Sequence, residues 1–204
     1  MLTYKADNLA KRFGNRGIFR NLTFEATTGS VIALTGPNGS GKSTLSKILM
    51  GLLPASAGTI SVSLDETTLS LHERMIRTAA VTPYFNLYEA LTGYENFAFF
   101  ARLRDRKYDP AHAEKWLATF GLAGRGDDAL GGYSSGMRQR LKFAISFALK
   151  PEILFLDEPG SNLDTNGKAI VFSETQKLKS HTLIFWATNE PEELQYADRV
   201  VRLA

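Results

Sequence analysis

Residues 36–44 form a glycine-rich segment that limits the possible folds of this chain more than any other feature. The segment reads Gly36-Pro37-Asn38-Gly39-Ser40-Gly41-Lys42-Ser43-Thr44 and fills every fixed position of the phosphate-binding pattern G-x-x-x-x-G-K-[ST]. An apolar run at 31–35 precedes it and predicts a buried strand, and a helical pattern at 45–50 follows it. A strand, a glycine turn and a helix N-terminus place backbone N–H groups around an anion. The segment therefore predicts a nucleotide-phosphate site rather than a simple glycine turn.

The side chains of this segment also have expected roles. Its three glycines let the backbone approach a phosphate closely. Lys42 supplies a cation for the terminal phosphates, and the hydroxyl of Ser43 is a ligand for Mg²⁺.

Composition places the chain among soluble globular proteins and excludes several classes of site. The 204 residues suffice for one domain, and 44% of them are apolar while 22% are charged. There is no cysteine, which excludes disulfides and thiolate metal sites. The net charge of +3 is scattered, and Asp105 interrupts the densest basic run at 102–107, so we expect no nucleic-acid partner. We expect neither a secretory leader nor a membrane span, so that any membrane role requires a partner.

The hydrophobic pattern predicts an α/β fold, with a mainly parallel sheet in a phosphate-loop NTPase core. Alternation at 2–6 and 22–28 predicts strands of an N-terminal antiparallel β subdomain, with turns between them at 11–14 and 15–17. Further strands are expected at 58–63, 78–82, 153–156, 181–188 and 199–203. We expect one domain over 1–204, in which 1–85 and 151–204 form the sheet core with the β subdomain. A helical subdomain at about 86–150 is inserted between them.

A carboxylate pair follows one of the predicted core strands. Asp157 and Glu158 come directly after the apolar run at 153–156. Ligands of open α/β sheets bind at the carboxyl ends of strands. Asp157 is therefore expected to face the Mg²⁺ held by Ser43, and Glu158 to polarise an attacking water as general base. Without the phosphate loop, such a pair would be a weak signal.

Over essentially its whole length the chain resembles the ATP-binding cassette (ABC) ATPases. Tyr133-Ser134-Ser135-Gly136-Met137 occupies the position of the family signature Leu-Ser-Gly-Gly-Gln, and the acid strand follows it as in the family. The resemblance implies that the core formed by 1–85 and 151–204 is RecA-like. The same resemblance implies that Phe13 stacks on adenine and that Glu158 is catalytic. It also implies that Ser161 and Asp164 belong to a loop that crosses a dimer interface.

The signature gives the resemblance a specific consequence. Ser134 and Gly136 begin a predicted helix, so a hydroxyl and free backbone N–H groups point outward. In the family, this second donor set, here 134–137, closes over ATP bound to another subunit. The resemblance thus implies ATP and Mg²⁺ as cofactors and an ATP-dependent homodimer. An ordinary helix cap at Ser134 or Ser135 stays open as the alternative.

The chain departs from the family pattern at three places. Pro83, or Tyr84 with a slip of one residue, stands where the family has a glutamine that binds Mg²⁺. Asn189 replaces a histidine that contacts the γ-phosphate, and it donates a hydrogen bond without a positive charge. In the signature, Ser135 and Met137 replace glycine and glutamine. We therefore expect an ATPase that is slow in isolation.

Two functions are compatible with this pattern. The first is a subunit that powers a separate transmembrane permease, lies on the cytoplasmic face of the membrane, and docks through residues near 83–100. The alternative is a soluble ABC ATPase that drives an assembly process such as iron–sulfur cluster formation. A third hypothesis, a small-molecule kinase, leaves 134–140 unexplained.

Overall fold

The computed structural model describes residues 1–203 and divides the chain into two compact units. The first unit comprises Met1–Thr78, Glu152–Glu158 and the chain from Lys179 onward. The second comprises Ala79–Pro151 and Pro159–Leu178. The expected helical subdomain at 86–150 stays a prediction.

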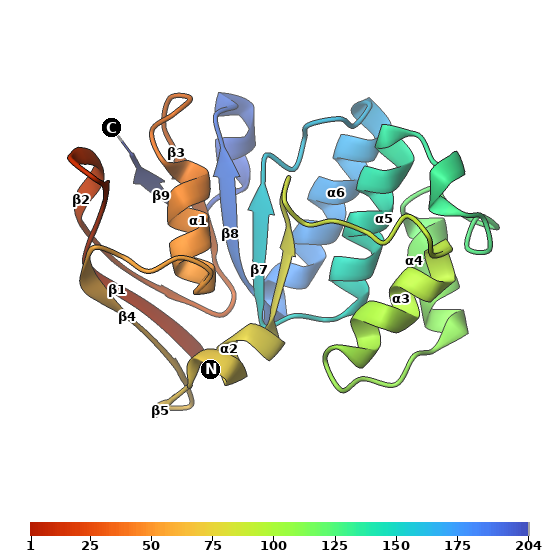
Figure 1. Cartoon of the computed structure of the whole chain (residues 1–204), viewed down its shortest axis with the longest axis horizontal. Helices are drawn as coiled ribbons and strands as arrows, with labels where there is room; N and C mark the ends of the chain where they lie inside the picture. The colour runs from red at the N-terminus through yellow and green to blue at the C-terminus, as the bar shows by residue number, and fades with distance from the viewer. Residues whose placement is uncertain (204) are drawn as a thin grey trace. The chain divides into compact units, whose positions relative to one another are not determined.

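An antiparallel sheet forms one part of the first unit. Its strand order is β2 (Arg16–Thr27), β1 (Leu2–Phe13), β4 (Ala57–Leu64) and β5 (Thr67–Thr68) (Figure 1). Leu2, Tyr4 and Ala6 alternate with more exposed residues along β1, which explains why this segment forms a strand with one buried face. The N-terminal antiparallel sheet expected from the sequence is confirmed.

The hairpin of β1 and β2 is longer than the sequence predicts. Residues 11–13 and 16–17, expected as turns, belong to the strands, and only Gly14 and Asn15 connect them. Asn8 and Asn21 have left-handed φ values of 49° and 53°, and the strand register shifts between Ala6 and Leu9. Such irregularities displace the side-chain alternation, so a strict period of two ends near residue 6.

A parallel sheet positions the phosphate loop in the same unit. In this unit its strands run in the order β7 (Ile153–Asp157), β8 (Leu183–Thr188), β3 (Val31–Thr35) and β9 (Arg199–Arg202), and each neighbouring pair is parallel. All residues of β7 and β8 are buried, as expected for central strands of a parallel sheet. Helix α1 (Lys42–Met50) packs on β7 and β8. The predicted parallel core is confirmed.

Short elements complete the first unit. Helix α2 (Leu71–Arg77) begins with a capping box, in which Ser70 and Glu73 bond each other's backbone N–H groups. It leads to β6 (Thr78–Val81), which continues into the second unit. Two 3₁₀ turns flank β8: η2 (Lys179–His181) and η3 (Pro191–Tyr196). Strand β8 therefore begins two residues later than the strand predicted at 181–188.

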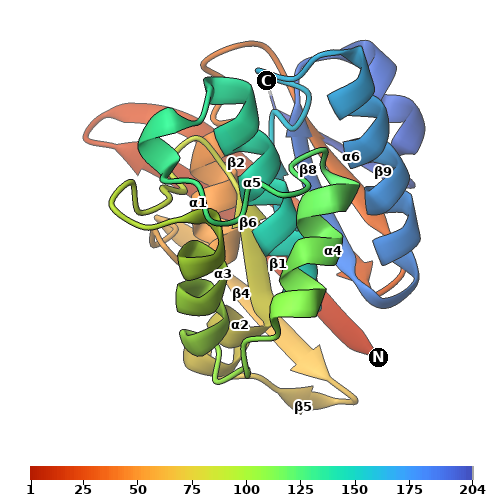
Figure 2. The same cartoon turned by 90° about the vertical axis from the view of Figure 1, so that its right-hand side faces the viewer.

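The second unit is helical. It contains α3 (Gly93–Arg102), α4 (Pro110–Thr119), η1 (Leu130–Gly132), α5 (Ser135–Ala148) and α6 (Thr165–Leu178). Helices α3, α4 and α5 contact one another, as Figure 2 shows. Phe120 lies between Trp116 on α4 and Phe143 and Phe147 on α5, with ring centroids 5.5–6.1 Å apart. This aromatic stripe is thus helical core. No helix within residues 1–203 has the length and apolar character needed to cross a bilayer.

Candidate nucleotide site

The glycine-rich segment forms a loop between β3 and α1, as its pattern predicts (Figure 1). Helix α1 begins at Lys42, and its N-cap is Gly41 with a φ of 99°. A side chain at 41 would be strained, and its Cβ would clash with Ile18 of β2. At Gly36, a Cβ would lie 2.5 Å from the carbonyl oxygen of Leu203. The loop therefore needs glycine at both positions to bring its backbone N–H groups to the start of α1.

The ammonium group of Lys42 is held inside this loop. Its Nζ donates hydrogen bonds to the carbonyl oxygens of Gly36 at 2.9 Å and Pro37 at 3.3 Å, and the residue is 6% exposed. These bonds place a positive charge beside the N-terminus of α1, where the helix dipole also favours an anion.

Asp157 ends β7 next to this loop, and its surroundings fit a Mg²⁺ ligand. The residue is 4% exposed, and its Oδ2 is buried without a hydrogen-bond partner. Burial raises the pKa of Asp157, while the side-chain hydrogen bond with Ser43 lowers it and nearby Glu158 raises it further. A hydroxyl and a carboxylate are the hard oxygen donors that Mg²⁺ prefers. Within residues 1–203, no three His, Asp or Glu side chains cluster in a way that could hold a metal ion. Mg²⁺ is commonly bound through only one or two carboxylates together with substrate phosphates and water.

The raised pKa of Asp157 predicts that this site destabilises the ligand-free protein. We expect Asp157→Asn to raise the thermal unfolding midpoint at neutral pH without nucleotide or Mg²⁺, because the amide removes a buried charge. For an acid with a raised pKa, the destabilisation is present above the folded-state pKa and disappears as the pH falls below the unfolded value. The difference in unfolding midpoint between the parent and Asp157→Asn should therefore become smaller as the pH is lowered.

Differential scanning calorimetry of the parent and Asp157→Asn, from neutral to acidic pH, measures the two unfolding midpoints. Replacing exposed Asp127 by Asn removes the same charge elsewhere and serves as the control. A lower midpoint for Asp157→Asn at neutral pH would contradict the argument.

Glu158 and Asn189 follow neighbouring strands of the parallel sheet. Glu158 has a left-handed φ of 51°, and its N–H donates to the carbonyl oxygen of Ala187 at 2.8 Å, which anchors its backbone beside β8. Asn189 comes directly after β8, and its Nδ2 donates to Oδ1 of Asn38 in the loop at 3.3 Å. The structure therefore places Asn189 against the phosphate loop, and its contact with a γ-phosphate stays a prediction.

The aromatic candidate for adenine lies at the end of β1. Phe13 is 50% exposed, and Nζ of Lys11 lies 4.7 Å from its ring centroid. Lys11 is itself fixed by a hydrogen bond of 2.8 Å to the carbonyl oxygen of Pro54. Sequence reasoning missed Ile18, which lies against Gly41 of the loop. No motif marks Ile18, because its position depends on the irregular register of the hairpin.

The signature residues lie in the second unit, at the start of α5. Oγ of Ser134 caps this helix by accepting a hydrogen bond of 3.2 Å from the N–H of Met137. Ser135 and Gly136 occupy the first turn, and a Cβ on Gly136 would lie 3.5 Å from the carbonyl oxygen of Asn162. The cap geometry fits both the plain helix cap and an outward donor set, so a role in a second phosphate site stays a prediction.

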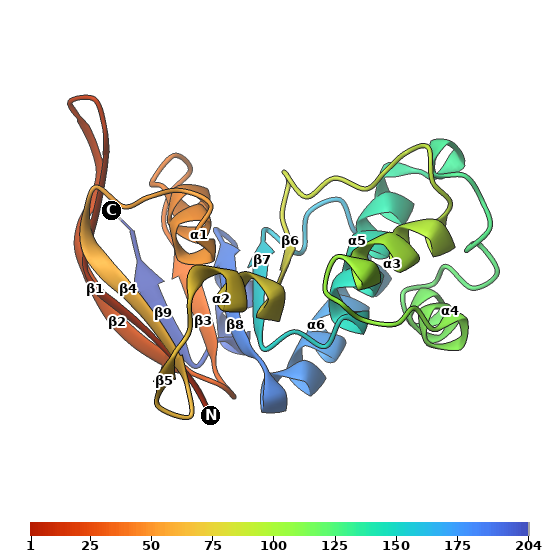
Figure 3. The same cartoon turned by 60° about the horizontal axis from the view of Figure 1, so that its bottom comes forward.

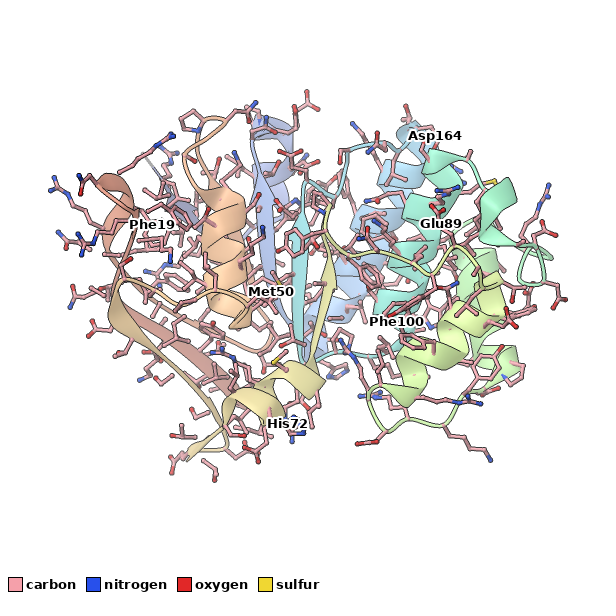
Figure 4. All side chains as sticks on the ribbon, in the orientation of Figure 1. Phe19, Met50, His72, Glu89, Phe100 and Asp164 are labelled. Carbon is pink, nitrogen blue, oxygen red and sulfur yellow. The ribbon has the colours of Figure 1, made fainter. Side chains whose placement is uncertain are left out.

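The candidate dimer loop, which contains Ser161, is tied to α5 through Asp164 (labelled in Figure 4). Oδ1 of Asp164 accepts hydrogen bonds from the N–H of Gly167 at 2.8 Å and from the guanidinium of Arg140 at 2.6 Å. Both bonds lower the pKa of Asp164. Asp164 thus connects α5 with the segment before α6 and stays ionised at neutral pH.

The region that lacks the family glutamine contains the amide side chains of Asn86 and Asn96. Pro83 and Asn86 are exposed residues of the second unit. Asn96 is fully buried, but its amide bonds the N–H and carbonyl of Tyr88 and the carbonyl of Thr92 at 2.9–3.1 Å. Asn96 therefore has a structural role in holding the loop before α3.

Comparison with known proteins gives a consistent result. A family model described as "ABC transporter" matches residues 19–161. The daunorubicin resistance ATP-binding protein DrrA3 of Streptomyces coeruleorubidus is 35% identical over 95% of this chain and 63% of its own length. The sulfate/thiosulfate import ATP-binding protein CysA of Synechococcus elongatus is 32% identical over 97% of this chain and 58% of its own. The chain thus spans slightly less than two thirds of the length of these relatives.

Solved structures agree with these relatives. The ATP-binding subunit of an ABC transporter superposes with a TM-score of 0.86 at 25% identity, covering 98% of this chain and 85% of that one. A dimeric ATP-binding cassette bound to ADP and Pi gives a TM-score of 0.85 at 23% identity over 98% of this chain and 94% of that one, and it supports the fold.

Proposed function

Because this chain belongs to the ABC transporter family, we propose that it is the ATP-binding and ATP-hydrolysing subunit of a transporter. The observation that carries the proposal is the loop at 36–44, with Lys42 buried inside it and Asp157 beside it at the carboxyl edge of a parallel sheet. This arrangement combines the charge and the metal-ligating oxygens that phosphoryl transfer requires.

The residues of the first unit have distinct proposed roles. The loop N–H groups and Lys42 bind the phosphates, and Phe13 stacks on adenine. Ser43 and Asp157 would hold Mg²⁺, which neutralises phosphate charge when bound. Glu158 accepts the proton of the attacking water as general base, and Asn189 donates a hydrogen bond to a γ-phosphate oxygen.

The signature residues of the second unit are proposed to act on a second copy of this chain. Each chain carries one phosphate loop and one separate donor set at 134–137, so two ATP molecules would join two chains head to tail. Ser161 and Asp164 would lie at the interface, where the ion pair with Arg140 holds the loop in shape. The alternative of a helix cap alone predicts no ATP-dependent dimer.

A transmembrane permease is the proposed partner, which would keep this chain on the cytoplasmic face of the membrane. The relatives named above are proteins of drug resistance and of sulfate or thiosulfate import, which favours transport over iron–sulfur assembly. Co-expression with the membrane proteins encoded beside its gene, followed by membrane sedimentation, tests this role. We expect the chain in the membrane fraction only when the permease is present, and an equal soluble fraction in both cases would favour the assembly role.

The residue at 189 is expected to limit the ATPase rate. Asn189→His should raise kcat, because a cationic imidazole donates a charge-assisted hydrogen bond worth about 1–3 kcal/mol at most. Asn189→Ala, which removes the donor, is the matched comparison and should be slower than the parent. Steady-state phosphate release measures all three, and an unchanged or lower rate for Asn189→His would contradict the role given to this position.

A further inference from the structure

A cavity of about 530 Å³ lies in the first unit, away from the phosphate loop residues. Its lining comes from β1, the end of α1, the segment that follows α1, the β4–β5 hairpin and α2; Figure 3 labels these strands and helices. Representative lining residues are Leu9, Ile48, Leu52, Ile60, Val62 and Leu69. Figure 4 labels Met50 at the end of α1 and His72 on α2, the two helices that border it. Volume and lining fall in the range of small-molecule sites.

Among the described residues, Arg74 is the one charged side chain in this lining. Its Nε is buried without a hydrogen-bond partner, and its guanidinium lies over Gly51, where any Cβ would clash with it. Arg77, on the same helix, forms an ion pair with Glu152. Within residues 1–203, no acidic side chain lines the cavity. A guanidinium half-buried among apolar side chains without a counter-charge is a site for an anion.

Capping of α1 does not account for the position of Arg74. The N–H groups of Gly51 and Leu52 already bond the carbonyl oxygens of Ile48 and Lys47 at 3.0 and 2.9 Å. The hydroxyl of Tyr4 bonds the carbonyl oxygen of Leu49. Burial raises the pKa of Tyr4, so its phenol is neutral and supplies no counter-charge. Three of the last four carbonyls of α1 therefore have partners other than Arg74.

The mouth of the cavity is apolar. Leu52 is 53% exposed and Leu71 is 51% exposed, and both line the cavity. The adjoining face of α2 carries Met75 and Ile76, which are 45% and 37% exposed. Large apolar side chains are thus gathered around one cation, which suits a ligand that has a long apolar tail and a single negative group.

We propose that this cavity binds a single-chain aliphatic carboxylate, with the carboxylate on the guanidinium of Arg74 and the chain along the apolar lining. The site is independent of the nucleotide site, so the inference does not depend on the function proposed above. A ligand of this cavity needs both an anionic group for Arg74 and an apolar chain for the lining. Free phosphate lacks the chain and short carboxylates have too little of it, so neither is expected to bind well.

Calorimetric titration with dodecanoate below its micelle concentration tests the proposal. We expect one binding event per chain, weakened at least about tenfold by Arg74→Gln, since a hydrogen-bonded charge pair is lost. Arg74→Lys, which keeps the charge, should retain more affinity than Arg74→Gln. Arg102→Gln removes the same charge from an exposed position in the second unit and should bind like the parent.

A second variant tests the apolar part without altering Arg74. Ile60 is a half-buried lining residue on β4, on the same face of the strand as Val62, and Ile60→Trp should fill part of the cavity and weaken binding. Dodecanol lacks the negative charge and butyrate lacks the tail, so both should bind more weakly than dodecanoate. Absence of dodecanoate binding, or equal affinity in the parent, Arg74→Gln and Ile60→Trp, would overturn the proposal. Lys42→Ala should bind dodecanoate normally, which separates this test from that of the nucleotide site.

Discussion

Lys42→Ala is expected to lose ATP affinity by about ten- to a hundredfold while keeping its fold. The variant leaves the backbone cradle of the loop intact but removes the ammonium group that the structure holds within it. A charge-assisted hydrogen bond contributes about 1.5–3 kcal/mol, which corresponds to this range of affinity. Calorimetric titration with ATP at constant salt measures the loss.

Two controls make this result specific. Lys168→Ala removes the same charge from an exposed position on α6 and should bind ATP like the parent. The thermal unfolding midpoint of Lys42→Ala should stay close to that of the parent without nucleotide. Equal ATP affinity in the parent and in Lys42→Ala would show that the loop does not hold the terminal phosphates.

Glu158→Gln is expected to bind ATP, hydrolyse it about 10²–10⁴-fold more slowly, and accumulate as a dimer. The amide keeps the size of the side chain and cannot accept the proton of water. Persistent ATP would then join the phosphate loop of one chain to the 134–137 donor set of another. Sedimentation velocity with ATP and Mg²⁺, together with phosphate release, measures both effects.

The double variant Lys42→Ala/Glu158→Gln should stay monomeric, because it binds ATP weakly. It therefore distinguishes dimerisation through ATP from unspecific association. Glu158→Gln that remains monomeric at every protein concentration would contradict dimerisation of the isolated chain. Unchanged hydrolysis would contradict the role of Glu158 as base, whatever the oligomeric state.

Local patterns in the sequence predict the central parts of this fold well. The phosphate loop, the buried runs of β3, β7 and β8, and the acids after β7 follow from short stretches whose residue types have one physical interpretation. Parallel pairing of these strands then brings Asp157 and Ser43 together, as their positions at strand and helix ends predict.

Features that depend on distant pairing could not be predicted in the same way. The irregular register near Asn8 lengthens the β1–β2 hairpin and brings Ile18 to Gly41, although neither residue belongs to a motif. The hydrogen bond between Asn189 and Asn38 joins residues 151 positions apart. The ion pair of Arg140 with Asp164 depends on how α5 packs beside the segment before α6. The cavity around Arg74 is lined by β1, the end of α1, the segment that follows α1, the β4–β5 hairpin and α2, which share no sequence pattern.

The left-handed backbone at Glu158 has a consequence for laboratory evolution of this protein. A φ of 51° is unfavourable for a glutamate and suits glycine, so Glu158→Gly should relieve backbone strain while removing the general base. Replacing Asp157 should likewise stabilise the fold while removing a metal ligand, because its buried charge opposes folding. A library selected only for heat resistance would therefore accumulate inactive sequences at these two adjacent positions. Selection for a more thermostable enzyme must therefore also select for ATP hydrolysis in every round.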